Sequence, residues 1–345
     1  NGRSVVNRSE STGGRRRPWG RTRPGTHVPV LLREVLGCLR PSEGEVVVDA
    51  TLGYGGHAER LARRIGPSGR LIGLDVDRTQ LAATGRRLAA EGVAVRTHHA
   101  NFSHLREILD AEGLDSADVI FADLGVSSMQ LDAPERGMGY RHPDAPLDMR
   151  LDTAGPRTAA DLLATIDEAA LSAALRDLAD EPDHAKIAAW IVRQRAVAPL
   201  MRVSQLTRLV MDAKGLTKRT WRDDASTRYG QLHPAARTFQ ALRILVNDEL
   251  GVLRALLEAL PACLRPGGRA GIISFHSGED RLVKQAFGDG CRQGLYARCS
   301  SGPLTPRPSE VRANPRSASA KFRWAAAPAP ADVPPVDPAP PPPRR

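Results

Sequence analysis

Three glycines, Gly53, Gly55 and Gly56, form a loop that follows a run of valines and precedes a helical pattern. A glycine-rich turn between a strand and a helix lets a ligand approach the backbone, and the free N–H groups of the helix start attract anions. Asp75 ends the next apolar run, roughly 20 residues further on, where a carboxylate is placed to accept hydrogen bonds from ribose hydroxyls. These residues predict a nucleotide-like cofactor. A purely structural turn, and a helix-capping role for Asp75, are the alternatives.

The spacing within the loop separates two classes of cofactor. A dinucleotide site has the pattern G-x-G-x-x-G, whereas here Gly56 follows Gly55 directly. An acidic residue, Asp49, also stands four positions before Gly53. Both features favour S-adenosylmethionine over NAD.

The apolar runs predict a doubly wound α/β fold. Strand-like runs are expected at 46–49, 70–75, 93–98, 117–123 and 270–276, with a late edge strand at 317–324. Because helical patterns alternate with the first four runs, the strands should be parallel and should bind ligands at their carboxyl ends. The chemistry-bearing residues at or just after those ends are His57, Asp75, Phe102 and Asp123. Their shared position predicts one common site.

Between about 132 and 233 the pattern is helical, with helices expected at 158–166, 168–179, 184–196 and 204–213. A basic loop follows, with the candidate RNA-contacting residues Lys214, Lys218, Arg219, Trp221 and Arg222. Cations beside an aromatic ring suit phosphate contact and base stacking, although a solvated surface loop fits the same pattern. One long helix is then expected over 236–260, with Arg243 and Asn247 on a polar side.

Composition limits the class of protein. The chain has 345 residues and a net charge of +10, of which residues 1–26 carry seven Arg against one Glu. This segment and the proline-rich residues 328–345 lack apolar periodicity and are expected to be disordered tails. The four cysteines form no C-x-x-C pair, so neither zinc nor a disulfide framework is expected. We expect no metal, no membrane segment and a cytoplasmic location; the oligomeric state stays open.

Several motifs that together span most of the chain occur in a fixed order. They are Asp49-Ala-Thr-Leu-Gly-Tyr-Gly-Gly-His57, Asp123-Leu-Gly-Val-Ser-Ser-Met-Gln-Leu-Asp132, Glu135-Arg-Gly-Met-Gly-Tyr, Pro146-Leu-Asp-Met-Arg150, His233-Pro-Ala-Ala-Arg-Thr-Phe-Gln-Ala-Leu-Arg-Ile, Val246-Asn-Asp-Glu-Leu, Ile273-Ser-Phe-His-Ser-Gly-Glu-Asp-Arg281 and Asn314-Pro-Arg-Ser-Ala-Ser-Ala-Lys. With them the chain closely resembles the bacterial small-subunit rRNA cytosine-N4 methyltransferase family, from about His27 to Trp324.

The resemblance implies a class I (Rossmann-like) methyltransferase sheet, formed by residues 27–131 and 234–327, with an all-helical substrate domain inserted at 132–233. It implies that S-adenosylmethionine binds at Gly55, Gly56, His57, Asp75, Phe102, Asp123 and Gln130. It also implies a cytidine of 16S rRNA, in the small (30S) ribosomal subunit, as the substrate. Arg237, Arg243 and Asn247 join the candidate RNA-binding residues.

The proton acceptor at the target amine is not assigned. Asp123 could face the amine, the cofactor or both, and we expect it to face the cofactor. Three other functions are compatible with parts of the pattern: a small-molecule methyltransferase, an NAD-linked dehydrogenase, and a non-catalytic RNA-binding protein. The first would not need the basic loop, the second is disfavoured by the glycine spacing, and the third would ignore the cofactor.

Overall fold

The computed structural model describes residues 29–126, 130–131, 133–217, 220 and 233–330. The predictions for the segment 1–26, for most of 328–345, and for Lys218, Arg219, Trp221 and Arg222 fall outside these residues.

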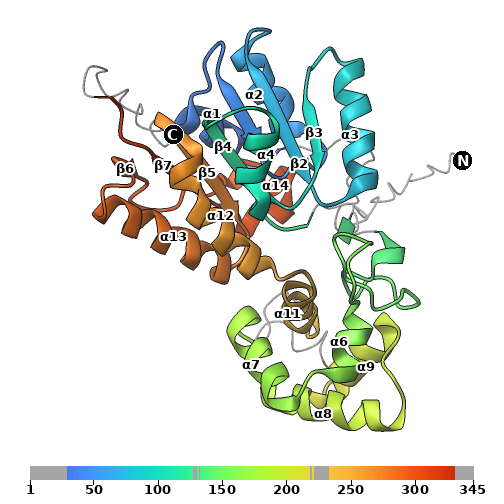
Figure 1. Ribbon diagram of the computed structural model, residues 1–345. Coiled ribbons are helices and arrows are strands. Elements are labelled where there is room, and N and C mark those ends of the chain that lie inside the picture. The colour runs from blue at the N-terminus through green and yellow to red at the C-terminus, as the bar shows by residue number, and fades with distance from the viewer. Residues whose placement is uncertain (1–28, 127–129, 132, 218–219, 221–232, 331–345) are drawn as a thin grey trace, which may run out of the picture.

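A seven-stranded sheet organises the molecule, in the order β3-β2-β1-β4-β5-β7-β6 (Figure 1). The strands are β1 (Val46–Asp49), β2 (Arg70–Asp75), β3 (Arg96–His99), β4 (Ala117–Asp123), β5 (Leu264–Ser274), β6 (Arg298–Cys299) and β7 (Lys321–Ala326). The first five are parallel, whereas β7 runs antiparallel to β5 and β6 antiparallel to β7. All four residues of β1 are buried, as a valine run at the centre of a doubly covered sheet requires.

Helices cover both faces of this sheet. They are α1 (Leu32–Leu39), α2 (Gly56–Ile65), α3 (Arg78–Ala90), α4 (Leu105–Ala111), α12 (Glu249–Cys263), α13 (Ser277–Arg292) and α14 (Pro308–Ala313), with short 3₁₀ turns at η1 (Phe102–His104), η2 (Pro134–Arg136) and η3 (Pro315–Ser319). Leu105, Leu256 and Val283 bring α4, α12 and α13 into the core on one face. Leu39, Leu61 and Leu88 bring α1, α2 and α3 into the core on the other.

A second, helical unit lies beside the sheet (Figure 1). It contains α6 (Ala159–Thr165), α7 (Glu168–Ala179), α8 (His184–Val197), α9 (Val203–Ala213) and α11 (Ala236–Asn247). Its own core includes Leu171, Ile187, Val203 and Phe239. The chain leaves the sheet after β4 and returns through α12 to β5, so the insert joins the sheet at the carboxyl end of β4.

The long helix expected over 236–260 is wrong. The chain forms two helices, α11 and α12, separated by Asp248, whose φ of 46° is left-handed. Apolar residues of α11 pack in the core of the insert, and those of α12 pack in the core of the sheet. The boundary between the two cores therefore lies at Asp248 rather than at the expected position 233.

Two expectations for the strands also need correction. The strand expected at 317–324 is β7, and it lies between β5 and β6 rather than at the sheet edge, because the unpredicted β6 pairs outside it. The third strand begins at Arg96, later than the expected position 93.

At the end of β7 the chain stays in contact with the sheet, since the carbonyl oxygen of Pro328 accepts a 2.8 Å hydrogen bond from the N–H of Gly267. No helix among the described residues is long and apolar enough to cross a membrane.

Candidate functional site

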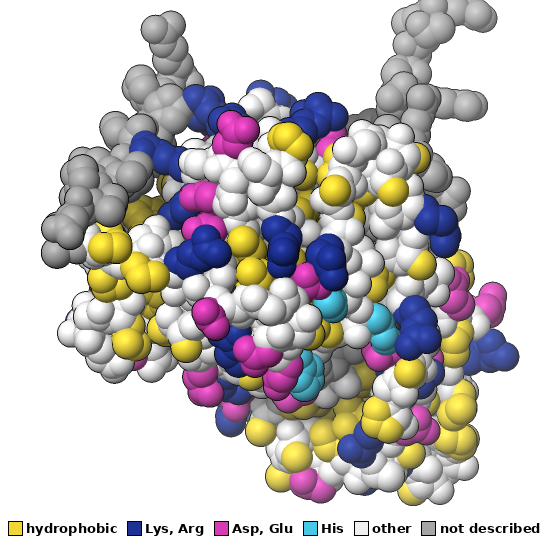
Figure 2. Space-filling model, turned by 45° about the horizontal axis from the view of Figure 1, so that its top comes forward, with side chains coloured by type: hydrophobic (Ala, Val, Ile, Leu, Met, Phe, Trp, Pro, Cys, Tyr) yellow, Lys and Arg dark blue, Asp and Glu magenta, His cyan; other side chains and the backbone are white. Residues whose placement is uncertain are grey.

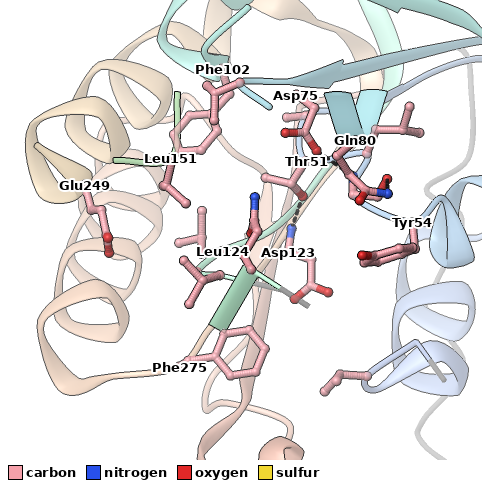
Figure 3. Close-up of a pocket in the computed structure, with 18 of the residues that line it drawn as sticks. Thr51, Tyr54, Asp75, Gln80, Phe102, Asp123, Leu124, Leu151, Glu249 and Phe275 are labelled. Atoms are coloured by element: carbon pink, nitrogen blue, oxygen red, sulfur yellow. Dashed lines mark hydrogen bonds between the residues drawn. The ribbon is translucent and has the colours of Figure 1, made fainter. Parts of the chain in front are cut away.

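A cavity of about 380 Å³ lies at the carboxyl ends of the parallel strands, with walls from both the sheet and the insert. All seven residues expected to bind the cofactor line it: Gly55, Gly56, His57, Asp75, Phe102, Asp123 and Gln130. Figure 3 shows Tyr54 and Gln80 on one side, Glu249 and Leu151 on the other, and Asp123 between them. The residue types at the strand ends therefore share one site, as the parallel fold predicts.

The glycine loop owes its composition partly to packing. Gly55 has a φ of 69°, and a Cβ there would lie 2.9 Å from Cγ2 of Thr84 on α3. A Cβ on Gly56 would lie 2.8 Å from Cγ of Pro29. Helix α2 begins at Gly56 without a side-chain cap, so its first N–H groups remain available at the cavity wall. The loop thus needs its glycines and also presents an anion-binding helix start.

Asp75 holds the loop in place. Its Oδ2 accepts a 2.8 Å hydrogen bond from the N–H of Gly53, and its Oδ1 accepts one of 2.8 Å from the N–H of Asp77. Asp77, not Asp75, caps α3, because its Oδ1 accepts from the N–H groups of Thr79 and Gln80. The capping alternative for Asp75 is therefore wrong. Each carboxylate oxygen of Asp75 still has a lone pair for a ligand hydroxyl.

Asp123 ends β4 at the centre of the cavity. Its backbone N–H donates to Oγ1 of Thr51 at 2.6 Å, as Figure 3 shows, and its Oδ1 is buried with no hydrogen-bond partner among the described residues. Burial raises the pKa of Asp123 well above its usual value, and the nearby Asp49 and Glu279 carboxyls add to that rise. The orphaned oxygen therefore favours a donor or a cation as its ligand.

His57 packs below Asp123. Its Nε2 lies 2.9 Å from the carbonyl oxygen of Val30, which only accepts, so Nε2 carries a proton. Its Nδ1 then faces Oδ2 of Asp123 at 3.6 Å. Asp49 lies deeper in the same region, and burial raises its pKa to about 7. The sheet thus keeps several proton-binding groups beneath the cavity floor.

The residue pattern missed several groups on the cavity wall. These are Thr51, Tyr54, Gln80, Leu151, Glu249, Phe275, Glu279, Asn314, Arg316 and Ser319. Some lay inside the quoted motifs, Glu249 in the Val246 motif and Asn314 and Arg316 in the last one. Phe275 directly follows β5 and Thr51 lies two residues after β1, so the strand ends could have indicated these two. The sequence position of the others does not show which side chains face a ligand.

The expected RNA contact of Lys214 is wrong. Its side chain is fully buried, and its Nζ donates to both carboxylate oxygens of Glu181, at 2.7 and 2.9 Å. Lys214 is part of the hydrophobic interior of the insert rather than of a basic surface. Of the other expected residues within the described chain, Arg237 donates to the carbonyl oxygen of Asp180.

Arg243 and Asn247 do line the cavity. The Asn247 side chain is occupied by the backbone, because Oδ1 accepts from Leu151 N at 2.7 Å and Nδ2 donates to Met149 O at 2.8 Å. It fixes the segment that follows the short bend at Met149, whose φ is 63°. Asn247 is therefore a positioning residue at the junction, whereas Arg243 keeps its charged group at the wall.

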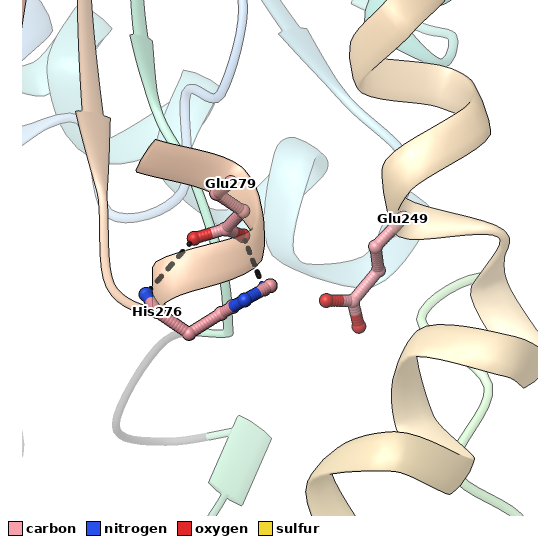
Figure 4. A group of neighbouring side chains, drawn as sticks. All are labelled: Glu249, His276 and Glu279. Atoms are coloured by element: carbon pink, nitrogen blue, oxygen red, sulfur yellow. Dashed lines mark hydrogen bonds and ion pairs between the residues drawn. The ribbon is translucent and has the colours of Figure 1, made fainter. Parts of the chain in front are cut away.

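Glu249, His276 and Glu279 converge beside the cavity, with their ligand-type atoms within 4.8 Å of one another (Figure 4). Nε2 of His276 lies 3.3 Å from Oε1 of Glu279, whose Oε2 accepts from the N–H of Phe275 at 2.8 Å. Burial opposes ionisation of Glu279, but these partners outweigh it and lower its pKa. Both oxygens of Glu249 accept from Arg243, so a guanidinium already supplies the positive charge of this cluster.

On the face shown in Figure 2, Lys and Arg side chains are interspersed with Asp and Glu rather than gathered in one basic patch. Electrostatic attraction to a polyanion on this face would therefore come from separate cations. The titratable and polar side chains that could bind a ligand together are those that line the cavity.

The sheet order, with β7 antiparallel between β5 and β6, and the cavity at the strand ends define a class I methyltransferase fold. Residues 25–327 match the model of the MraW methylase family, and the chain belongs to that family. A protein of Symbiobacterium thermophilum named ribosomal RNA small subunit methyltransferase H is 44% identical over 86% of this chain and 95% of its own length. A protein of the same name from Heliobacterium modesticaldum is 42% identical over 87% of this chain and 97% of its own length.

Proposed function

We propose that this protein transfers a methyl group from S-adenosylmethionine to N4 of a cytidine in the decoding centre of 16S rRNA, within the small ribosomal subunit. Membership of the MraW methylase family and the shared name of the relatives support this proposal. The observation that carries it is the convergence of the strand-end residues and a separate polar cluster on one cavity between the sheet and the insert. The reaction would take place in the cytoplasm, where small subunits are found.

The residues present fit the cofactor. Asp75 offers lone pairs to the ribose hydroxyls, and Phe102 offers an aromatic surface to the adenine ring. The uncapped start of α2 at Gly56 suits the carboxylate of the methionine part. The orphaned Oδ1 of Asp123 suits its ammonium group, and burial there strengthens such a pairing. Gln130 also lines the cavity.

The bound cofactor would supply an electrophilic methyl carbon, and the protein supplies alignment. The exocyclic amine of cytosine is a weak nucleophile because its lone pair is delocalised into the ring. Holding that amine in line with the methyl group can lower the barrier by about 7–11 kcal/mol at best. Asp123, which is hydrogen-bonded to Thr51 and faces His57, is suited to this role.

Recognition of the rRNA is assigned to the insert and to the loop after α9. Lys218, Arg219, Trp221 and Arg222 remain candidates for phosphate contact and stacking, and Arg237 lies on the insert beside Asp180. Lys214 has no part in this role because it is buried against Glu181.

The proposal is tested with purified protein and radiolabelled S-adenosylmethionine. We expect label to enter small ribosomal subunits from cells that lack this gene and to appear as N4-methylcytidine after digestion. Subunits from cells that have the gene are the control, because their target is already methylated. Incorporation into small-molecule amines but not into subunits would contradict the proposal.

A further inference from the structure

Arg243 and Glu249 form an ion pair across the junction of the two domains. Arg243 belongs to α11 of the insert, Glu249 to α12 of the sheet domain, and Asp248 separates the helices. Nε of Arg243 donates to Oε1 of Glu249 at 2.7 Å, and Nη2 donates to Oε2 at 2.9 Å. The two side chains are only 13% and 9% exposed, and both line the cavity.

The position of the pair places it beyond the groups suited to the cofactor. Figure 3 shows Glu249 across the cavity from Tyr54, with Asp123 between them. In Figure 3, Tyr54 and Gln80 lie on the side of Asp123 away from Glu249, whereas Phe102, which suits the adenine, lies above Leu151 on the same side as Glu249. Glu249 and Phe275 lie below Phe102 in this view, away from Asp75, which leaves this part of the wall to a methyl acceptor.

The pair also has unused hydrogen-bonding capacity. Nη1 of Arg243 donates to none of the residues that the structure describes, and each oxygen of Glu249 accepts one hydrogen bond although it has two lone pairs. A buried ion pair adds little stability over well-packed apolar residues, so fold stability alone does not account for it. A ligand that accepts from Arg243 and donates to Glu249 would use both groups.

Cytosine presents that pattern along its Watson–Crick edge, with acceptors at O2 and N3 beside the N4 amino donor. Building on the function proposed above, we propose that the Arg243–Glu249 pair binds this edge of the target cytosine, with Arg243 donating to the ring acceptors and Glu249 accepting from the N4 amino group. A hydrogen bond from N4–H to a carboxylate also holds the amine in the plane and direction needed for transfer. Uracil presents O4 to Glu249, so the same pair rejects uridine by repulsion.

The test uses the double variant Arg243→Met/Glu249→Met, together with the single variant Glu249→Gln. Apolar replacement of a buried ion pair is generally tolerated, so the double variant should fold. Glu45→Gln is the matched control, because Glu45 and Arg269 form another bidentate pair, with side chains 19% and 17% exposed, that does not line the cavity. All proteins are assayed for methylation of unmethylated small subunits, and the affinity for S-adenosylmethionine is measured by calorimetry.

We expect kcat/KM for subunits to fall about 10- to 100-fold in both cavity variants, since a good bidentate base contact is worth that much discrimination. Affinity for S-adenosylmethionine should stay within twofold of wild type, and Glu45→Gln should methylate normally. With S-adenosylhomocysteine present to prevent turnover, wild type should bind subunits with cytidine at the target at least several-fold more tightly than subunits with uridine there. The double variant should bind both equally.

Unchanged kcat/KM in the variants would overturn the inference, and so would a parallel loss of cofactor affinity, which would place the pair in the cofactor site. Equal binding of cytidine and uridine subunits by wild type would also overturn it. Failure of the wild-type protein to methylate subunits at all would instead contradict the proposed function, so the two failures are distinguishable.

Discussion

Asp49 and Asp123 show how individual residues of this fold carry both structure and chemistry. Asp49 is 1% exposed at the end of a strand whose other residues are all valines, and its Oδ1 accepts from the N–H of Thr51. Thr51 in turn accepts from the backbone of Asp123. A buried carboxyl thus supports the loop that fixes the residue at the cavity centre.

The raised pKa of Asp49, about 7 in the folded protein, predicts a pH dependence of stability. Above its ordinary value the unfolded chain has lost this proton while the folded protein keeps it, so the free energy of unfolding falls as pH rises toward 7, by roughly 1.4 kcal/mol per pH unit. Asp49→Asn removes the effect. Urea unfolding at pH 5 and pH 8 should show the variant gaining about 2–3 kcal/mol relative to wild type between the two conditions. If the unfolding free energies of wild type and Asp49→Asn differ by the same amount at pH 5 and at pH 8, the raised pKa of Asp49 is contradicted.

Asp75→Ala should weaken S-adenosylmethionine binding by about 1.5–3 kcal/mol, the range for hydrogen bonds to a charged group. The substitution also releases the N–H of Gly53, so part of the loss comes from a looser glycine loop. Asp75→Asn keeps one acceptor oxygen and should lose less. Calorimetry measures both variants, and an unchanged affinity in Asp75→Ala would remove this residue from the site.

Residue types were enough to predict which side chains at the strand ends share a cavity. They were not enough to predict which Lys and Arg side chains are exposed to solvent. His57, Asp75, Phe102 and Asp123 follow strands, and parallel strands align their carboxyl ends whatever the details of packing. Lys214 follows a helix in a segment rich in cations, and only the position of Glu181 in three dimensions shows that it is buried. A partner 33 residues away leaves no local pattern.

At the scale of elements, the Lys214–Glu181 pair ties the end of α9 to the turn between α7 and α8. Both side chains are fully buried, so Glu181→Ala removes the carboxylate that pairs with the buried Lys214 ammonium group and should cost about 3–5 kcal/mol in the free energy of unfolding. Lys214→Met/Glu181→Leu should recover most of that loss. Denaturant unfolding compares the three proteins. A cost below about 1 kcal/mol for Glu181→Ala would show that the pair is solvated.

The cations after Lys214 are tested separately from it. Replacing Lys218, Arg219 and Arg222 with Ala should raise KM for the small subunit and lower the log–log salt slope of binding by roughly 2–3 units, at about 0.7–0.9 per phosphate contact. Cofactor affinity should not change, since none of the three belongs to the glycine loop. Wild-type values for both the subunit KM and the salt slope would show that this loop makes no RNA contact.

The break between α11 and α12 shows why the sequence pattern did not predict where one helix ends and the next begins. Phe239, Leu242, Leu253 and Leu257 keep the helical spacing across Asp248, although the first two pack in the insert and the last two against the sheet. A single left-handed residue redirects the chain without disturbing the periodicity. Gly251 accompanies the break, because a Cβ there would lie 2.2 Å from Oδ2 of Asp248.

At the scale of the whole molecule, the sheet and the insert contribute different parts of one cavity. The sheet supplies the glycine loop, Asp75 and Asp123, whose positions follow from the alternation of strands and helices. The insert supplies Arg243 and Asn247 from α11, whose positions depend on how two cores pack against each other. The cofactor side was therefore predictable from pattern, whereas the acceptor side required the fold.

The central claim, N4-methylation of a cytidine in 16S rRNA, is tested most directly by mass spectrometry of that rRNA from cells with and without this gene. We expect N4-methylcytidine at one decoding-centre position in the parent, its loss in the deletion strain, and its return when the gene is restored. Restoration with Asp75→Ala should return little of it, because that variant binds the cofactor weakly. An identical N4-methylcytidine content in the parent and the deletion strain would contradict the proposed function.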